Sequence, residues 1–271
     1  MYFQRDLLAG RVAVVTGGGT GICRAIALAF AEHGCDVAIT SRRLEHLEAT
    51  VQELEAHGRR AVALPADVRD PNAVEQVMRR VGDEFGRLDI VVNGAAGNFV
   101  CLAENLSPNG FSTVVDIDLK GTFNVSTLAL PYLRRRGGVV LNISATLQYL
   151  GTIGQAHAAS AKAGVDALTR TLAAEWGPIG IRVNGLAPGP TEGTEGMRRL
   201  TGDKRDAIVQ QTPLRRLASL EDVAQAALFL CSDAAAFTNG VTLVVDGGLW
   251  LASSRVMSLP TEAELERAAG A

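Results

Sequence analysis

The sequence lacks an excess of either charge, a long apolar run and paired cysteines, and each absence excludes a class of protein. It contains 26 lysines and arginines against 29 aspartates and glutamates, so it has no overall basic field that would attract nucleic acid or an anionic membrane. No apolar run reaches the ~18 residues of a membrane span. Residues 1–10 also lack the charged start and apolar centre of a signal peptide. We therefore expect a soluble protein of the cytoplasm.

The four cysteines are also unpaired in spacing. They stand at positions 23, 35, 101 and 231 and include no Cys-x-x-Cys. This spacing matches neither a disulfide framework nor a zinc site. We expect reduced, mostly packed thiols and no metal site.

What the sequence does contain is a regular alternation of short β-branched runs and longer segments of helical period. Strands are expected at 11–15, 36–40, 60–64, 88–92, 138–143, 181–186 and 242–245, and helices at 20–33, 44–57, 71–85, 111–136, 156–176 and 220–231. This alternation is typical of a parallel sheet covered on both faces. It predicts an α/β fold with a Rossmann-like, doubly wound parallel sheet of about seven strands. One domain would span 1–271, with its core at about 9–249 and a loosely organised tail at 250–271, where 261–267 is expected to form a short surface helix.

A glycine-rich segment lies between the first expected strand and the first expected helix. It reads Thr16-Gly17-Gly18-Gly19-Thr20-Gly21. Glycines allow a tight turn here, so that the helix aims its unpaired N–H groups and the positive end of its dipole at a pyrophosphate. The segment predicts a dinucleotide site in which Gly17, Gly19, Thr20, Gly21 and Ile22 bind the cofactor.

The choice of cofactor is expected at the end of the second strand, which reads Ile39-Thr40-Ser41-Arg42-Arg43. An acidic residue at this place would bind the ribose hydroxyls of NAD, whereas an arginine would bind the 2′-phosphate of NADP. No carboxylate is present, and the planar guanidinium of Arg42 suits a phosphate. We therefore expect NADP(H), the alternative being that Arg42 and Arg43 are solvated residues before a helix.

Later segments complete a pattern that resembles the short-chain dehydrogenase/reductase family. They are Asn93-Gly94-Ala95-Ala96-Gly97, Lys162 and Pro188-Gly189. The resemblance implies further cofactor contacts by Asp67, Val68, Asn93, Lys162, Pro188, Gly189 and Thr194. Cys23 stands where this family usually has a glycine that serves close helix packing. We expect a small local shift there, with cofactor binding retained.

The catalytic positions of that family are largely changed in this chain. The family uses Asn, Ser, Tyr and Lys, and the matching residues here are Asp118, Ala145, Ala158 and Lys162. Without the tyrosine, ordinary alcohol–ketone chemistry is not expected. Either hydride transfer has been lost, or the substrate is a conjugated thioester in which negative charge develops far from the carbon that accepts the hydride.

The second interpretation is favoured because the chain resembles 2,4-dienoyl-CoA reductases of the peroxisomal type. The shared segments include 93–99, 116–118, 121–125, 157–158, 160–162, 187–190 and 193–196. The resemblance implies that NADPH reduces a 2,4-dienoyl-CoA to a 3-enoyl-CoA in the degradation (β-oxidation) of unsaturated fatty acids. It also implies that Asp118 and Lys162 handle the proton through an ordered water, and that helices 111–136 and 156–176 build a homotetramer. Mitochondrial relatives use a tyrosine at the position of Leu147.

Two alternatives stay open at this point. Tyr149 lies thirteen residues before Lys162 and could act as a substitute phenol in a carbonyl or 3-oxoacyl thioester reductase. The chain could also be a non-catalytic NADP-binding subunit. We expect Tyr149 to be a wall of the substrate pocket instead.

Other substrate contacts and the location complete the expectations. Phe99 is expected at the floor of the pocket, and Arg69 and Arg199 at the phosphates of coenzyme A, whereas His157 is expected to be structural. The sequence ends in Ala268-Ala269-Gly270-Ala271, without a Ser-Lys-Leu type address, which favours a cytoplasmic location.

Overall fold

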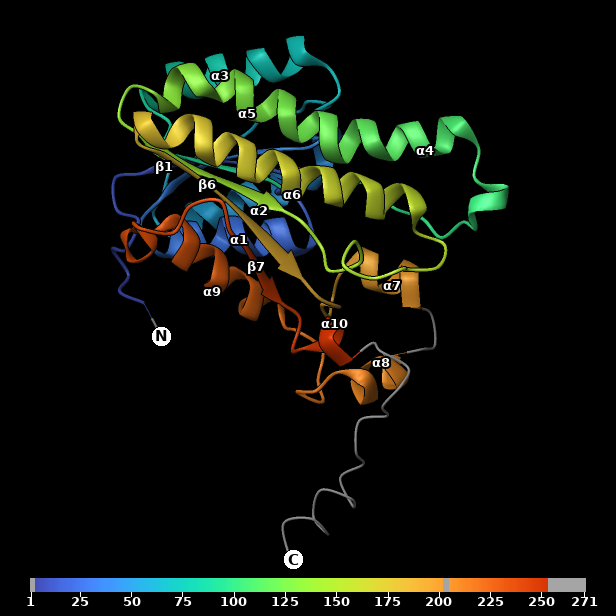
Figure 1. Cartoon of the computed structure of the whole chain (residues 1–271). Helices are drawn as coiled ribbons and strands as arrows, with labels where there is room; N and C mark the ends of the chain where they lie inside the picture. Colours follow the sequence, from blue (N-terminus) through green and yellow to red (C-terminus); the bar gives the residue numbers. More distant parts are fainter. Residues whose placement is uncertain (1–2, 202–204, 253–271) are drawn as a thin grey trace, which may run out of the picture.

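The seven expected strands form one parallel sheet in the computed structural model, which describes residues 3–201 and 205–252 (Figure 1). The strands are β1 (Val12–Thr16), β2 (Asp36–Thr40), β3 (Ala61–Ala63), β4 (Ile90–Asn93), β5 (Gly138–Ile143), β6 (Ile181–Pro188) and β7 (Thr242–Val245). Their order is β3-β2-β1-β4-β5-β6-β7. The doubly wound α/β fold is therefore confirmed. From β1 to β3 the strands are added toward one edge of the sheet, and from β4 to β7 they are added toward the other edge. A crevice is expected where this order switches, between β1 and β4, at the carboxyl ends of the strands.

The helices cover both faces of the sheet, as Figure 1 shows. The long ones are α1 (Gly21–Glu32), α2 (Glu45–Ala56), α3 (Pro71–Phe85), α4 (Pro108–Val115), α5 (Gly121–Leu133), α6 (Ala156–Trp176) and α9 (Leu220–Cys231). Alternate residues of β1 belong to different cores: Ala13 packs in the cluster with Phe30 of α1, whereas Val12 packs in the cluster with Val81 of α3. This alternation follows from the two-residue period of a strand. It explains why β1 and β2 are buried along their whole length.

Three helices begin and end as expected, namely α3, α6 and α9. Local signals fix some of these ends. The side chain of Asp70 accepts a hydrogen bond from the backbone N–H of Asn72, and Pro71 occupies the first turn of α3. Gly86 ends α3 with a φ of 72°. Both features are typical caps.

The helix expected at 111–136 is longer at its start and is interrupted. It begins at Pro108, passes through a π-helical segment at Asp116–Lys120 and continues as α5 to Leu133. A π-helical segment holds one more residue per turn than the α-helix around it and often occurs at functional sites. The candidate catalytic residue Asp118 lies inside it.

Three short helices were not expected: α7 (Glu195–Thr201), α8 (Arg205–Gln211) and α10 (Leu249–Ala252). They lie together at one end of the molecule in Figure 1. The surface helix expected at 261–267 lies outside the described residues. Within the described ranges, no helix is long and apolar enough to cross a membrane.

Candidate active site

A cleft of about 1000 Å³ opens at the carboxyl ends of the strands, at the crevice that the sheet order predicts. It is built from the loops after β1, β2, β3, β4, β5 and β6, together with α10. Most of the expected site residues line it: Gly17, Gly19, Thr20, Gly21, Ile22, Arg42, Asp67, Val68, Asp118, Lys162, Pro188, Gly189 and Thr194. The fold thus gathers residues from six loops into one cavity.

The glycine segment forms a cradle that side chains would fill. A Cβ atom on Gly19 would lie 2.5 Å from the backbone oxygen of His46. Gly17 has a φ of 73°, and a Cβ atom there would lie 3.1 Å from the backbone oxygen of Gly94. Thr20 begins α1 without a side-chain cap. The first N–H groups of α1 are therefore left for a ligand.

Cys23 occupies the position of the usual helix-packing glycine and contacts Gly94 across the cleft wall. A Cβ atom on Gly94 would lie 2.1 Å from the Cys23 Sγ atom. Burial raises the pKa of the Cys23 thiol to about 12. Cys23 is thus a packing residue, accommodated because position 94 has no side chain.

The end of β2 presents Arg42 to the cleft, and no carboxylate stands beside it in the strand. Arg42 is exposed. Asp67, also on the lining, is paired with Arg69: the Arg69 Nη2 and Asp67 Oδ2 atoms are 2.6 Å apart. The hydrogen bond from Arg69 lowers the pKa of Asp67. Arg69 itself is not part of the cleft lining, so the structure places it at Asp67.

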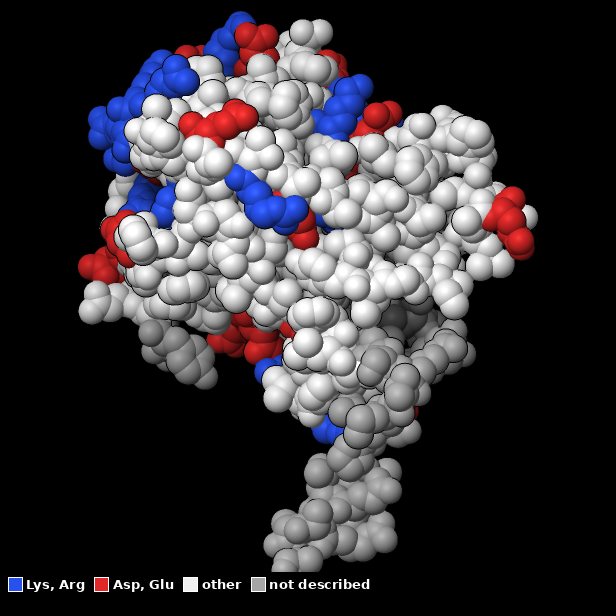
Figure 2. All heavy atoms as spheres, in the orientation of Figure 1, with Lys and Arg blue, Asp and Glu red and all other residues white. Residues whose placement is uncertain are grey.

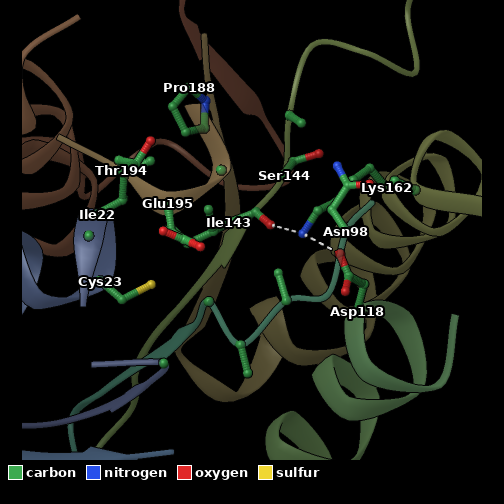
Figure 3. A pocket seen from close by; sticks show the side chains of 18 of the residues that line it. Ile22, Cys23, Asn98, Asp118, Ile143, Ser144, Lys162, Pro188, Thr194 and Glu195 are labelled. Carbon is green, nitrogen blue, oxygen red and sulfur yellow. Dashed lines mark hydrogen bonds and ion pairs between the residues drawn. The ribbon is translucent and has the colours of Figure 1, made fainter. Parts of the chain in front are cut away.

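Asp118 and Lys162 lie next to each other on the lining of the cleft (Figure 3). The Lys162 Nζ atom lies 3.2 Å from Asp118 Oδ2 and donates a 2.8 Å hydrogen bond to the backbone oxygen of Ile143. The second carboxylate oxygen of Asp118 accepts a 2.7 Å hydrogen bond from the Gly97 N–H. Only 2% of Asp118 and 8% of Lys162 are exposed. A buried cation and anion are therefore held in fixed positions at the cleft.

Asn98 lines the cleft near this pair, whereas its neighbour Phe99, which we expected at the floor of the pocket, does not. The Asn98 Oδ1 atom is buried and has no hydrogen-bond partner among the described residues. Figure 3 shows Asn98 on the same side of the cleft as Lys162 and Asp118. The Phe99 ring instead packs edge-on against His157, with 4.3 Å between ring centroids, and Phe99 is not part of the lining. The signal that could have identified Asn98 is an amide next to the glycine that binds Asp118.

Tyr149 is bound to a carboxylate behind the cleft wall. Its hydroxyl donates a 2.9 Å hydrogen bond to Asp166 Oδ2, and Tyr149 is not part of the lining, whereas Ala145 and Leu147 are. Burial, together with this hydrogen bond and the charge of Asp166, raises the pKa of Tyr149 to about 12. This geometry keeps the Tyr149 phenol away from the cleft.

The remaining expected residues have other places. Asn93 is buried between strands, where its Nδ2 donates to Ser126 Oγ and Asn142 Oδ1, both at 2.9 Å, and it does not line the cleft. The Thr194 hydroxyl donates to the Thr191 oxygen at 2.9 Å while it faces the cleft. Arg199 belongs to α7, but its side chain lies outside the described part of the structure. Among the residues that the structure describes, no group of three or more His, Cys, Asp or Glu side chains is placed to hold a metal ion.

Comparison with known proteins gives strong similarities along most of the chain. A family model described as enoyl-(acyl carrier protein) reductase matches residues 17–250. The chain is 50% identical over 253 residues to a peroxisomal 2,4-dienoyl-CoA reductase, (3E)-enoyl-CoA-producing, of Pongo abelii, covering 92% of this chain and 87% of the relative. It is 41% identical over 246 residues to a probable 2,4-dienoyl-CoA reductase, (2E)-enoyl-CoA-producing, of Bacillus subtilis, covering 89% and 97%.

A solved structure of the same fold carries a cofactor. It is a gluconate 5-dehydrogenase from Burkholderia cenocepacia in complex with NADP and tartrate. It superimposes with a TM-score of 0.85 at 32% identity and covers 90% of this chain and 97% of its own.

Proposed function

The chain belongs to the short-chain dehydrogenase/reductase family, and we propose that it is an NADPH-dependent 2,4-dienoyl-CoA reductase that acts in the degradation of unsaturated fatty acids. The observation that carries the proposal is the buried pair of Asp118 and Lys162 at a cleft that has Ala158 where a tyrosine would be needed for alcohol–ketone chemistry. The relatives named as 2,4-dienoyl-CoA reductases support the substrate class.

The residues of the cleft fit NADP(H). The glycine cradle and the uncapped start of α1 suit the pyrophosphate, and the exposed guanidinium of Arg42 suits the 2′-phosphate. Asp67 and Val68 would bind the adenine, and Pro188, Gly189 and Thr194 the nicotinamide end. Bound NADPH would supply the hydride, and the NADP complex of the Burkholderia structure supports this choice.

The chain's own residues would manage charge and proton. Lys162 has three N–H donors, and Ile143 and Asp118 accept two of them. We assign the third to the thioester oxygen or to an ordered water. The Asn98 Oδ1 atom, which has no partner among the described residues, would accept a hydrogen bond from that water. Negative charge that develops on the thioester oxygen is stabilised by such fixed donors.

Two protonation sites lead to two products. After hydride addition at the far end of the diene, a proton at the α carbon gives a 3-enoyl-CoA, whereas a proton at the γ carbon gives a 2-enoyl-CoA. We propose the 3-enoyl product, with Asp118 and Lys162 relaying the proton through water to the α carbon. The name of the Pongo relative supports this product, and that of the Bacillus relative designates the other.

The test is to mix the purified protein with NADPH and 2,4-hexadienoyl-CoA. We expect the absorbance of NADPH and that of the dienoyl group both to decrease, with 3-hexenoyl-CoA as the product. No turnover at any chain length, with NADPH still bound, would instead favour a non-catalytic NADP-binding subunit. A carbonyl or 3-oxoacyl thioester reductase that uses Tyr149 has no support in the geometry, because the Tyr149 hydroxyl is bound to Asp166.

We also propose a homotetramer. Phe111 and Phe123 on the α4–α5 side are 37% and 48% exposed, and Figure 2 shows few charged side chains over α4 and the adjacent part of α6. Such faces are typical of subunit contacts. Light scattering of the purified protein tests this. A cytoplasmic location stays a prediction, since the peroxisomal names belong to relatives.

A further inference from the structure

Part of the cleft lining is apolar and, among the residues that the structure describes, has no cationic side chain. It is formed by Val100, Leu147, Leu150, Ile153, Leu249 and Trp250, which we call the apolar wall. Of the cleft-lining residues in the described ranges, Arg42 and Lys162 are the ones that carry a lysine or arginine charge. The phosphates of coenzyme A would not be stabilised at the apolar wall, whereas a hydrocarbon chain would be.

Trp250 reaches this wall from the far end of the chain because α10 is anchored. Asp246 accepts hydrogen bonds of 2.8 Å from the backbone N–H groups of Gly248 and Trp250. Gly247 and Gly248 have φ values of 65° and 85°, which other residues rarely adopt. This turn directs α10 over the cleft.

Tyr149 supports Trp250 from behind. The two rings lie 5.4 Å apart at an interplanar angle of 50°, a favourable separation for an aromatic pair. The hydroxyl of Tyr149 is in turn fixed by Asp166, which is 4% exposed.

Asp166 ties three parts of the site together. Besides Tyr149, its carboxylate accepts hydrogen bonds from Ser144 Oγ at 2.6 Å, from Gln148 Nε2 at 2.8 Å and from Thr242 Oγ1 at 3.2 Å. These donors belong to the end of β5, the β5–α6 loop and β7. One buried carboxylate thus holds the loop that carries Leu147 and Leu150 and, through Tyr149, orients Trp250.

From this arrangement we propose that Trp250 is a specificity-determining residue that contacts the acyl chain beyond the diene, and that Tyr149 is a positioning residue that acts through Trp250. The inference rests on the proposed function for its substrate. A 2,4-hexadienoyl group has a single carbon beyond the diene, so on this proposal it would end before Trp250. Longer acyl chains would continue along the apolar wall.

The test measures kcat and KM with 2,4-hexadienoyl-, 2,4-decadienoyl- and 2,4-tetradecadienoyl-CoA. Trp250→Ala should lower kcat/KM for tetradecadienoyl-CoA about tenfold more than kcat/KM for hexadienoyl-CoA, mainly through KM, because apolar contact with the longer chain is lost. Tyr149→Phe keeps the ring and removes the hydrogen bond to Asp166. The fall in kcat/KM should therefore depend on chain length in the same way as in Trp250→Ala and be smaller. Phe237→Ala, at a fully exposed aromatic residue outside the cleft, should change nothing at any length.

An equal loss at all chain lengths, no loss at all, or a gain for the long chain would overturn the proposal. A second readout does not need turnover. The chain has two tryptophans, and Trp176 is buried in α6 and does not line the cleft. With NADP⁺ bound, saturated tetradecanoyl-CoA should shift the Trp250 fluorescence and hexanoyl-CoA should not, and Trp250→Phe should abolish the shift. If this shift appears without dienoyl turnover, the acyl contact of Trp250 is supported and the proposed function fails. If turnover occurs without dependence on chain length, the proposed function is supported and the acyl contact of Trp250 fails.

Discussion

The carboxylate of Asp118 and the ammonium of Lys162 lie 3.2 Å apart, and each has a further backbone partner, Gly97 for the aspartate and Ile143 for the lysine. The pair is therefore held from both sides rather than by its own attraction alone. Because Gly97 follows β4 and Ile143 ends β5, the sheet itself sets the position of the pair. A proton relay built on it would need little reorganisation.

Asp118→Ala should lower kcat about a hundredfold or more, because the relay would lose its acid–base group. The measurement is NADPH oxidation with 2,4-hexadienoyl-CoA, alongside circular dichroism to check folding. Asp116→Ala is the matched control, since Asp116 is a half-exposed carboxylate two residues away whose ion-pair partner is Lys120. Similar losses in both variants would show that Asp118 serves the helix rather than the reaction.

Arg42→Ala should remove most of the preference for NADPH over NADH, because a charge-assisted contact to the 2′-phosphate is lost. We expect the ratio of the two kcat/KM values to fall about tenfold to a hundredfold, corresponding to about 1.5–3 kcal/mol for a hydrogen bond to a charged group. Arg79→Ala, an exposed arginine on α3, should leave the ratio as it is. An unchanged ratio in Arg42→Ala would place the phosphate elsewhere.

Gly94→Ala should destabilise the protein by about 1–3 kcal/mol, because the new Cβ atom would meet the Cys23 sulfur. The two atoms would be 2.1 Å apart, too close for any real contact. Cys23→Gly in the same chain should recover much of the loss, and the two effects should not be additive. Urea unfolding of the two single variants and the double variant measures this; strict additivity would mean that another neighbour of Gly94 causes the loss.

Asp36 should contribute stability that depends on pH. Burial raises its pKa, but hydrogen bonds from Arg60 and Arg59 outweigh this and lower the pKa below the usual 3.8. A depressed folded-state pKa means that the stabilisation is present above the unfolded-state pKa and is lost as pH falls through the folded-state value. Asp36→Asn should therefore unfold more easily than the parent at pH 7, with the gap closing below about pH 4. A gap that stays constant with pH would show that the charge of Asp36 is not involved.

The fold could be predicted closely because its signals are local. Buried β-branched strands alternate with amphipathic helices, and caps such as Asp70 and Gly86 mark the ends of α3. The short helix α10 gave no such signal, since its four residues are positioned by Asp246 and by two glycines with positive φ rather than by their own propensity.

The site was predicted where spacing along the chain fixes it. Asp118 and Lys162 occupy helices packed on the sheet, so their meeting follows from the fold. Tyr149 depends on the conformation of the β5–α6 loop, and its partner Asp166 lies seventeen residues later. A carboxylate four residues after Lys162 suggests an ion pair within the helix, yet the two side chains bind different partners. Asn98 and Phe99 lie in the loop after β4, so the conformation of that loop decides that Asn98, rather than Phe99, reaches the cleft.

The π-helical segment at Asp116–Lys120 holds one residue more than the α-helical turn that it replaces. Removing one residue would convert the segment to regular α-helix and leave α4 and α5 nearly in phase, so Val114 would stay buried. The side chains inside the segment would point in new directions, and Asp118 would lose its orientation toward Lys162. Insertions and deletions tolerated by the surface loops should therefore be excluded from these five residues.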